Sequence, residues 1–119
     1  MSKKLLFHFT AAPYGSTRAK DALDAVLAAS AYEQDISLLF SGDGVFQLLN
    51  TQDGHAAEQK NLASLLSVFP MYDIEKIFVQ ASALSQRQLN LEQLAVDSQP
   101  LTDTEVAALM DQQDSLFSF

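Results

Sequence analysis

The chain has 119 residues, which is the size of one ordinary domain. Of these residues 48% are hydrophobic and 18% are charged, so the chain has enough apolar side chains for a packed core and is not expected to be disordered. Fifteen acidic residues against seven basic ones give a formal charge of -8, which opposes direct binding to nucleic acid. The sequence contains no cysteine, which excludes disulfides, thiolate nucleophiles and Cys-ligated zinc. The apolar run Leu5–Phe9 is too short for a secretion signal or a membrane span. We therefore expect a single domain over residues 1–119, located in the cytoplasm and without membrane contact.

The first part of the chain alternates strand and helix patterns. Leu5–Phe9 is a continuous apolar run, typical of a strand that is buried on both faces. From Ser16 to Leu27 apolar residues recur every three or four positions, which predicts a helix with Ser16 or Thr17 as its N-cap. A second apolar run, Ile36–Phe40, predicts the second strand.

The second strand ends in Ser41–Gly44, a turn sequence in which we expect positive φ at the glycines. Gly44 in particular is expected to take a left-handed conformation just before a short helix at Val45–Leu49. A longer helix is predicted at Glu58–Phe69, where Pro70 stops it. The turn thus joins a strand to a helical segment, as βα loops do.

The last part of the chain contains a third strand pattern at Ile74–Val79 and one or two helical turns at Ser82–Leu89. Leu94–Val96 is a weaker strand candidate. Thr102–Glu105 has the spacing of a capping box and predicts a C-terminal helix. Leu116–Phe119 predicts a closing strand at a sheet edge or facing a partner.

Strands separated by helical segments imply right-handed crossovers, so the predicted fold is a three-layer α/β/α sandwich with a mostly parallel sheet of about five strands. Open parallel sheets bind ligands at the carboxyl ends of their strands. The loops Thr10–Thr17, Ser41–Gly44 and Gln80–Ser85 are therefore expected to share one edge. The stretch Ala12–Arg18 leads into a helix and could hold an anion there, but it matches no nucleotide-binding fingerprint, and ordinary helix capping explains it.

Other single residues also have two interpretations. Asp43 could act as an acid, a base or a metal ligand, while capping of the next helix is the simpler role. His8 and His55 lack the spacing of a metal site or a catalytic triad, which favours a hydrogen-bonded structural histidine and an exposed one. Tyr14 and Tyr72 could stack on a ligand or close a core or interface. A hydrolase built on Asp43 with either histidine has no recognisable motif.

Four segments occur in an order that resembles the TusC/DsrF family: Ala12–Ser16, Asp43–Leu49, Tyr72–Glu75 and Ala81–Leu84. The resemblance extends over essentially the whole chain, and D-G-V-F-Q-L-L is its most specific piece. It implies a DsrEFH-like fold and a subunit of a TusBCD-type sulfurtransferase complex. That complex is a heterohexamer with TusB-like and TusD-like subunits, receives sulfur from a TusA-like carrier and serves 2-thiolation of the tRNA wobble uridine.

In the family, the persulfide-carrying cysteine belongs to the DsrE/TusD-type subunit and lies just after the third strand. The resemblance puts Gln80 at or next to that position, and an amide has no thiolate to load with sulfur. We therefore expect a structural subunit with no catalytic residue, no cofactor and no metal. A DsrF-like role in sulfur oxidation stays open, and so does a stand-alone flavodoxin-like domain that binds a small anion or flavin at Ala12–Arg18.

Apolar side chains that a single domain would leave exposed indicate an assembly interface, and such a chain could self-associate when isolated. The candidate interface residues are Phe46, Leu48, Leu49, Met71, Tyr72, Phe117 and Phe119.

Overall fold

The structure is a computed structural model that describes residues 3–10, 18–32, 35–48, 74, 76–94 and 98–119, with the backbone alone for residues 18–23 and 47. Five strands form one sheet in the order β4-β3-β2-β1-β5, and each neighbouring pair is parallel. The strands are β1 (Lys4–Phe9), β2 (Asp35–Phe40), β3 (Lys76–Gln80), β4 (Gln99–Leu101) and β5 (Ser115–Ser118). The helical elements are α1 (Arg18–Ser30), η1 (Gly42–Leu48), α3 (Ala81–Gln86), η3 (Leu91–Gln93) and α4 (Asp103–Asp111), of which η1 and η3 are 3₁₀ helices.

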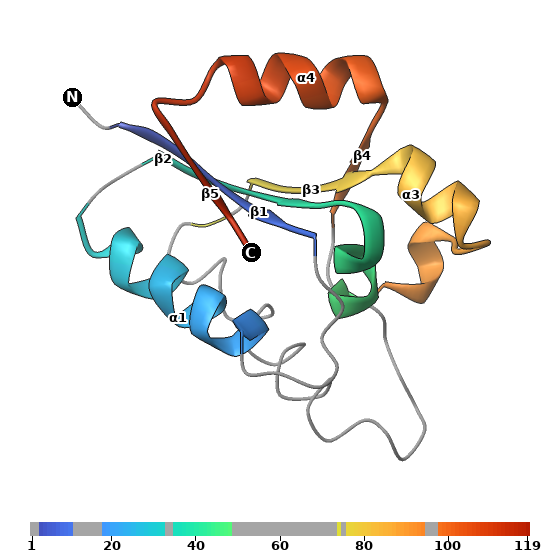
Figure 1. Cartoon of the computed structure of the whole chain (residues 1–119), viewed down its shortest axis with the longest axis horizontal. Coiled ribbons are helices and arrows are strands. Elements are labelled where there is room, and N and C mark those ends of the chain that lie inside the picture. The colour runs from blue at the N-terminus through green and yellow to red at the C-terminus, as the bar shows by residue number, and fades with distance from the viewer. Residues whose placement is uncertain (1–2, 11–17, 33–34, 49–73, 75, 95–97) are drawn as a thin grey trace.

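Helices lie on both faces of the sheet (Figure 1). α4 covers one face, and α1 lies on the opposite face, where η1 packs below the ends of the strands. This arrangement confirms the predicted three-layer α/β/α class with a parallel sheet. Within the described residues, no helix combines the length and the apolar character that crossing a bilayer requires.

The central strands are buried on both faces, which is why they read as continuous apolar runs. On the α4 face, Leu6 and Leu39 pack with Leu101 and Val106, and all four are buried. On the opposite face, Phe7, Phe9, Leu38 and Phe40 form a second cluster with Val26 of α1. Full burial of one such side chain stabilises the fold by about 1.5–3 kcal/mol, so the two clusters hold the layers together.

A row of phenylalanine rings runs from the middle of the sheet to its β5 edge. Phe40 stacks on Phe9 with centroids 4.7 Å apart, and Phe9 lies 5.8 Å from Phe119. Phe119 lies 6.2 Å from Phe7, which in turn stacks on Phe117 at 5.1 Å. These five residues are called the aromatic row below. Because Phe117 is 43% exposed, the row begins in the core and ends at the surface.

Most of the predicted elements that fall on described residues are confirmed. The strands at Leu5–Phe9, Ile36–Phe40 and Ile74–Val79 correspond to β1, β2 and β3, and Leu116–Phe119 corresponds to β5 at a sheet edge. The capping box of α4 is present, because the Glu105 backbone N–H donates to Thr102 Oγ1 at 3.2 Å and the Thr102 N–H donates to Glu105 Oε1 at 2.9 Å.

Two boundaries differ from the prediction. η1 begins at Gly42 rather than Val45, and α3 ends at Gln86 rather than continuing to Leu89, since Gln88 has a positive φ of 56°. Of the strand expected at Leu94–Val96 only Leu94 is described, and it forms an isolated bridge, while β4 was not predicted. Pro100 argues against a strand in the sequence, but β4 lies at the edge of the sheet, where a strand can include a proline that has no N–H to donate. The helix expected at Glu58–Phe69 and the N-cap at Ser16 or Thr17 lie outside the described residues.

Candidate functional site

The carboxyl ends of β1, β2 and β3 meet at one edge of the sheet, called the carboxyl edge below. The Ser41 N–H donates to the Phe9 carbonyl at 3.0 Å, and the Gly42 N–H donates to Gln80 Oε1 at 3.3 Å. The loops Ser41–Gly44 and Gln80–Ser85 therefore lie together, as predicted. Of the third loop, only Thr10 is described; the rest, including Tyr14 and the anion-loop candidate up to Thr17, lies outside the description, as do the side chain of Arg18 and residues His55 and Tyr72.

The two glycines of the turn are required for different reasons. Gly42 has φ +54°, which is the left-handed conformation that was expected. The same expectation is wrong for Gly44, whose φ is not positive. A Cβ on Gly44 would instead lie 2.0 Å from the Phe9 carbonyl oxygen, because the turn passes directly against the end of β1. Gly44 is thus needed for close packing of two backbones.

Gln80 is the last residue of β3 and the N-cap residue of α3, where its backbone is extended at φ -72° and ψ 116°. Both ends of its side-chain amide are bonded. Oε1 accepts from the Gly42 N–H, and Nε2 donates to Asp103 Oδ1 at 3.2 Å. Ser82 Oγ donates to the same Asp103 oxygen at 2.8 Å. Gln80 therefore links η1 to the first turn of α4, and its amide is held in one orientation.

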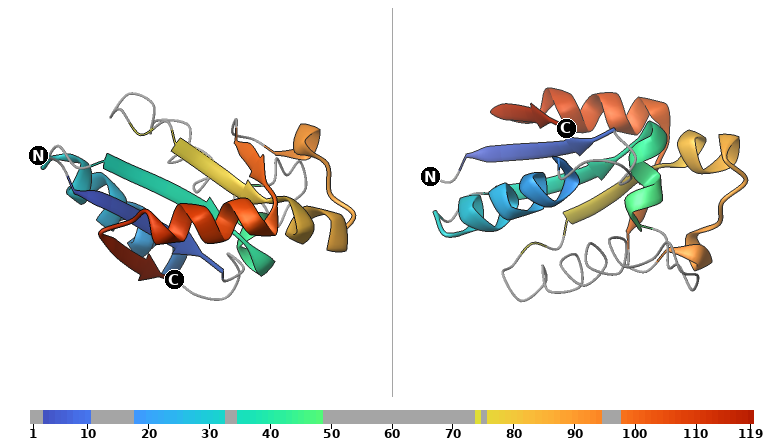
Figure 2. Two further views of the ribbon diagram at one scale, coloured as in Figure 1. Left: turned by 90° about the horizontal axis from the view of Figure 1, so that it is seen from above. Right: turned by 60° about the horizontal axis from the view of Figure 1, so that its bottom comes forward.

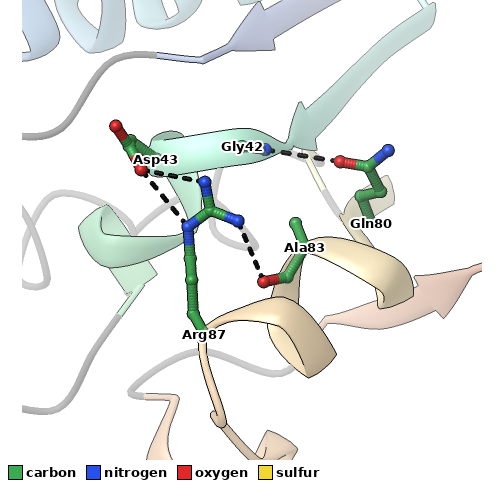
Figure 3. Close-up of polar contacts among 5 residues, drawn as sticks. All are labelled: Gly42, Asp43, Gln80, Ala83 and Arg87. Carbon is green, nitrogen blue, oxygen red and sulfur yellow. Dashed lines mark hydrogen bonds and ion pairs between the residues drawn. The ribbon is translucent and has the colours of Figure 1, made fainter.

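Asp43, the acidic candidate of the sequence analysis, is paired with Arg87 (Figure 3). Arg87 Nη2 and Nε donate to Asp43 Oδ1 at 2.9 and 3.2 Å, while Nη1 donates to the Ala83 carbonyl at 3.2 Å. The guanidinium also lies 5.9 Å from the ring centroid of Phe46. Because the Asp43 side chain is 61% exposed, an ion pair of this kind contributes at most about 1 kcal/mol. It fixes η1 against α3 rather than presenting a free carboxylate.

His8 is the half-buried histidine of β1, and its Nε2 is hydrogen-bonded to Ser41 Oγ. Burial lowers the pKa of His8 below its ordinary value of 6.5, so the ring is neutral at pH 7. Ser41 is itself 7% exposed, which keeps the hydroxyl from a substrate. The contact agrees with the structural interpretation of His8. In the part of the chain that the structure describes, no group of three His, Asp or Glu residues could hold a metal ion.

The interface candidates divide into three groups. Phe117 is 43% exposed, while Phe46 and Phe119 are partly buried, the first under Arg87 and the second within the aromatic row. Leu48 was expected at the surface, and this is corrected: it is fully buried in the chain's own core, because η1 turns that side chain toward the sheet. Leu49, Met71 and Tyr72 lie outside the described residues.

Sequence reasoning missed Arg87 and Asp103 as members of this edge. Asp103 was visible only inside the capping-box spacing Thr102–Glu105, and its bonds to Gln80 and Ser82 bridge residues more than twenty positions apart. Arg87 lies 44 residues from Asp43. Spacing alone carries no signal for either contact. The edge therefore offers the amide of Gln80, the carboxylates of Asp43 and Asp103 and the hydroxyls of Ser41 and Ser82, each with a hydrogen-bond partner within the chain, and no thiol exists anywhere in the chain.

A family model described as "DsrE/DsrF-like family" matches residues 3–119. The chain belongs to this family. "Protein TusC homolog" from Vibrio parahaemolyticus is 41% identical over 116 residues, covering 98% of both chains, and the protein of the same description from Aliivibrio fischeri is 34% identical with the same coverage. The crystal structure of the ychN protein from E. coli superposes with a TM-score of 0.76 over 100% of both chains. At 20% identity, that likeness shows the DsrE-like fold alone.

Proposed function

We propose that this DsrE/DsrF-like chain is a non-catalytic structural subunit of a TusBCD-type sulfurtransferase complex, in which it positions TusB-like and TusD-like subunits. The relatives that are named TusC homologues support the assignment to this subunit type. The complex receives sulfur from a TusA-like carrier and passes it on for 2-thiolation of the tRNA wobble uridine. The chain itself touches no nucleic acid, in keeping with its charge of -8.

The observation that carries the non-catalytic role is the state of Gln80. Sulfur relay requires a thiolate that attacks and holds a sulfur atom, and an amide does neither. Both polar atoms of the Gln80 side chain are already bonded within the chain, to the Gly42 N–H and to Asp103 Oδ1. With no cysteine in the sequence, a sulfur atom delivered to the complex must be carried by another subunit.

Intact mass spectrometry tests the proposal directly. The three subunits are co-expressed, purified as one complex and incubated with a persulfide donor. We expect a gain of sulfur on the TusD-like subunit and none on this chain. A reproducible mass increment on this chain, or failure of the three subunits to co-purify, would contradict the proposal.

The role of the complex is tested by the 2-thiouridine content of cellular tRNA. Cells that lack this chain should lose the modification, and a Gln80→Ala variant that assembles with its sister subunits should restore it. Loss of thiolation in an assembled Gln80→Ala complex would assign a catalytic role to this position. An unchanged 2-thiouridine level in cells without the chain would exclude tRNA thiolation.

A further inference from the structure

We draw no further inference here: the strongest candidate, the outer side of β5 at the edge of the sheet, where Leu116 and Phe117 are exposed (Figure 2), carries nothing because nothing in the described residues shows what covers it.

Discussion

The carboxyl edge and the β5 edge differ in how far their side chains are engaged within the chain. At the carboxyl edge, the side chains of Gln80, Asp103 and Arg87 are bonded within the chain, at the place where open parallel sheets usually bind ligands. At the β5 edge, Leu116 and Phe117 of β5 are exposed, and among the described strands only β1 pairs with β5. The comparison contrasts an edge whose described polar side chains bond to one another with an edge that leaves two apolar side chains exposed. Changes at the carboxyl edge should therefore alter stability, and changes at β5 should alter assembly.

Gly44→Ala is expected to have the largest effect. Its Cβ would lie 2.0 Å from the Phe9 carbonyl oxygen, so the backbones of η1 and β1 would have to separate. We expect a loss of about 3 kcal/mol or more in the free energy of unfolding, at the upper end of the range for overpacking. Chemical denaturation of the isolated chain measures it.

Gly42→Ala is the matched control for Gly44→Ala. Its Cβ would have 3.8 Å of space to the Thr10 carbonyl oxygen, and only the left-handed φ opposes the substitution. That cost is about 1–2 kcal/mol. If Gly44→Ala proved no more destabilising than Gly42→Ala, close packing of the turn against β1 would be refuted.

Gln80→Glu should have the next largest effect. The change is nearly isosteric, but it replaces the donor to Asp103 by a second carboxylate only 3.2 Å from the first. We expect about 1–2 kcal/mol of destabilisation at neutral pH, from a lost hydrogen bond and repulsion between like charges. Asp103→Asn in the same chain should restore most of it, since an amide can donate to the new carboxylate. Additive losses in this double-mutant cycle would show that the two residues do not interact.

His8 predicts a smaller, pH-dependent effect. Burial holds the pKa of His8 in the folded chain below its value of 6.5 in the unfolded chain, so between these values the unfolded state binds more protons. The free energy of unfolding should therefore be highest above pH 6.5 and should fall as pH decreases through the window below it. His8→Gln keeps a hydrogen-bonding group near Ser41 without titrating, and it should flatten this dependence. If the free energies of unfolding of the wild type and of His8→Gln changed equally with pH, His8 would not be the group that causes the dependence.

Leu116→Ser should have almost no effect on the free energy of unfolding of the isolated chain, in contrast to the substitutions at the carboxyl edge. Leu116 is 51% exposed, so the free energy of unfolding at low protein concentration should change by no more than about 0.5 kcal/mol. Self-association at high concentration should nevertheless decrease. Thermal melts at the two concentrations separate these quantities, and a large loss of stability at low concentration would place Leu116 in the core instead.

The sequence predicted the fold because its signals were local. Leu5–Phe9 and Ile36–Phe40 read as buried strands, since both of their faces are covered, and the capping box at Thr102 marks the start of α4. β4 was not predicted, because Pro100 argues against a strand unless that strand lies at a sheet edge. Gly44 was explained by the wrong cause, since a sequence shows that a glycine is present but not which backbone approaches it.

The candidate site was less predictable, for a related reason. Gln80 was singled out only through the family resemblance, and its partners Gly42 and Asp103 lie 38 and 23 residues away. Leu48 was expected at the surface because a helix this short was not expected to bury Phe46, Leu48 and Leu49 together, whereas its burial depends on how η1 is oriented against the sheet. Contacts of this kind are set by the folded topology and leave no periodic pattern.

The pairing of β5 with β1 also has a consequence for the order of folding. The Lys4 N–H and the Asp114 carboxylate that it contacts are 110 residues apart, so the last strand can only be added after nearly all of the chain has been synthesised. Closing so long a loop is slow and entropically costly. A chain released early would therefore lack both β5 and the ring of Phe117 on which the aromatic row ends. A product truncated before Ser115 would leave the side of β1 that β5 occupies without its parallel partner.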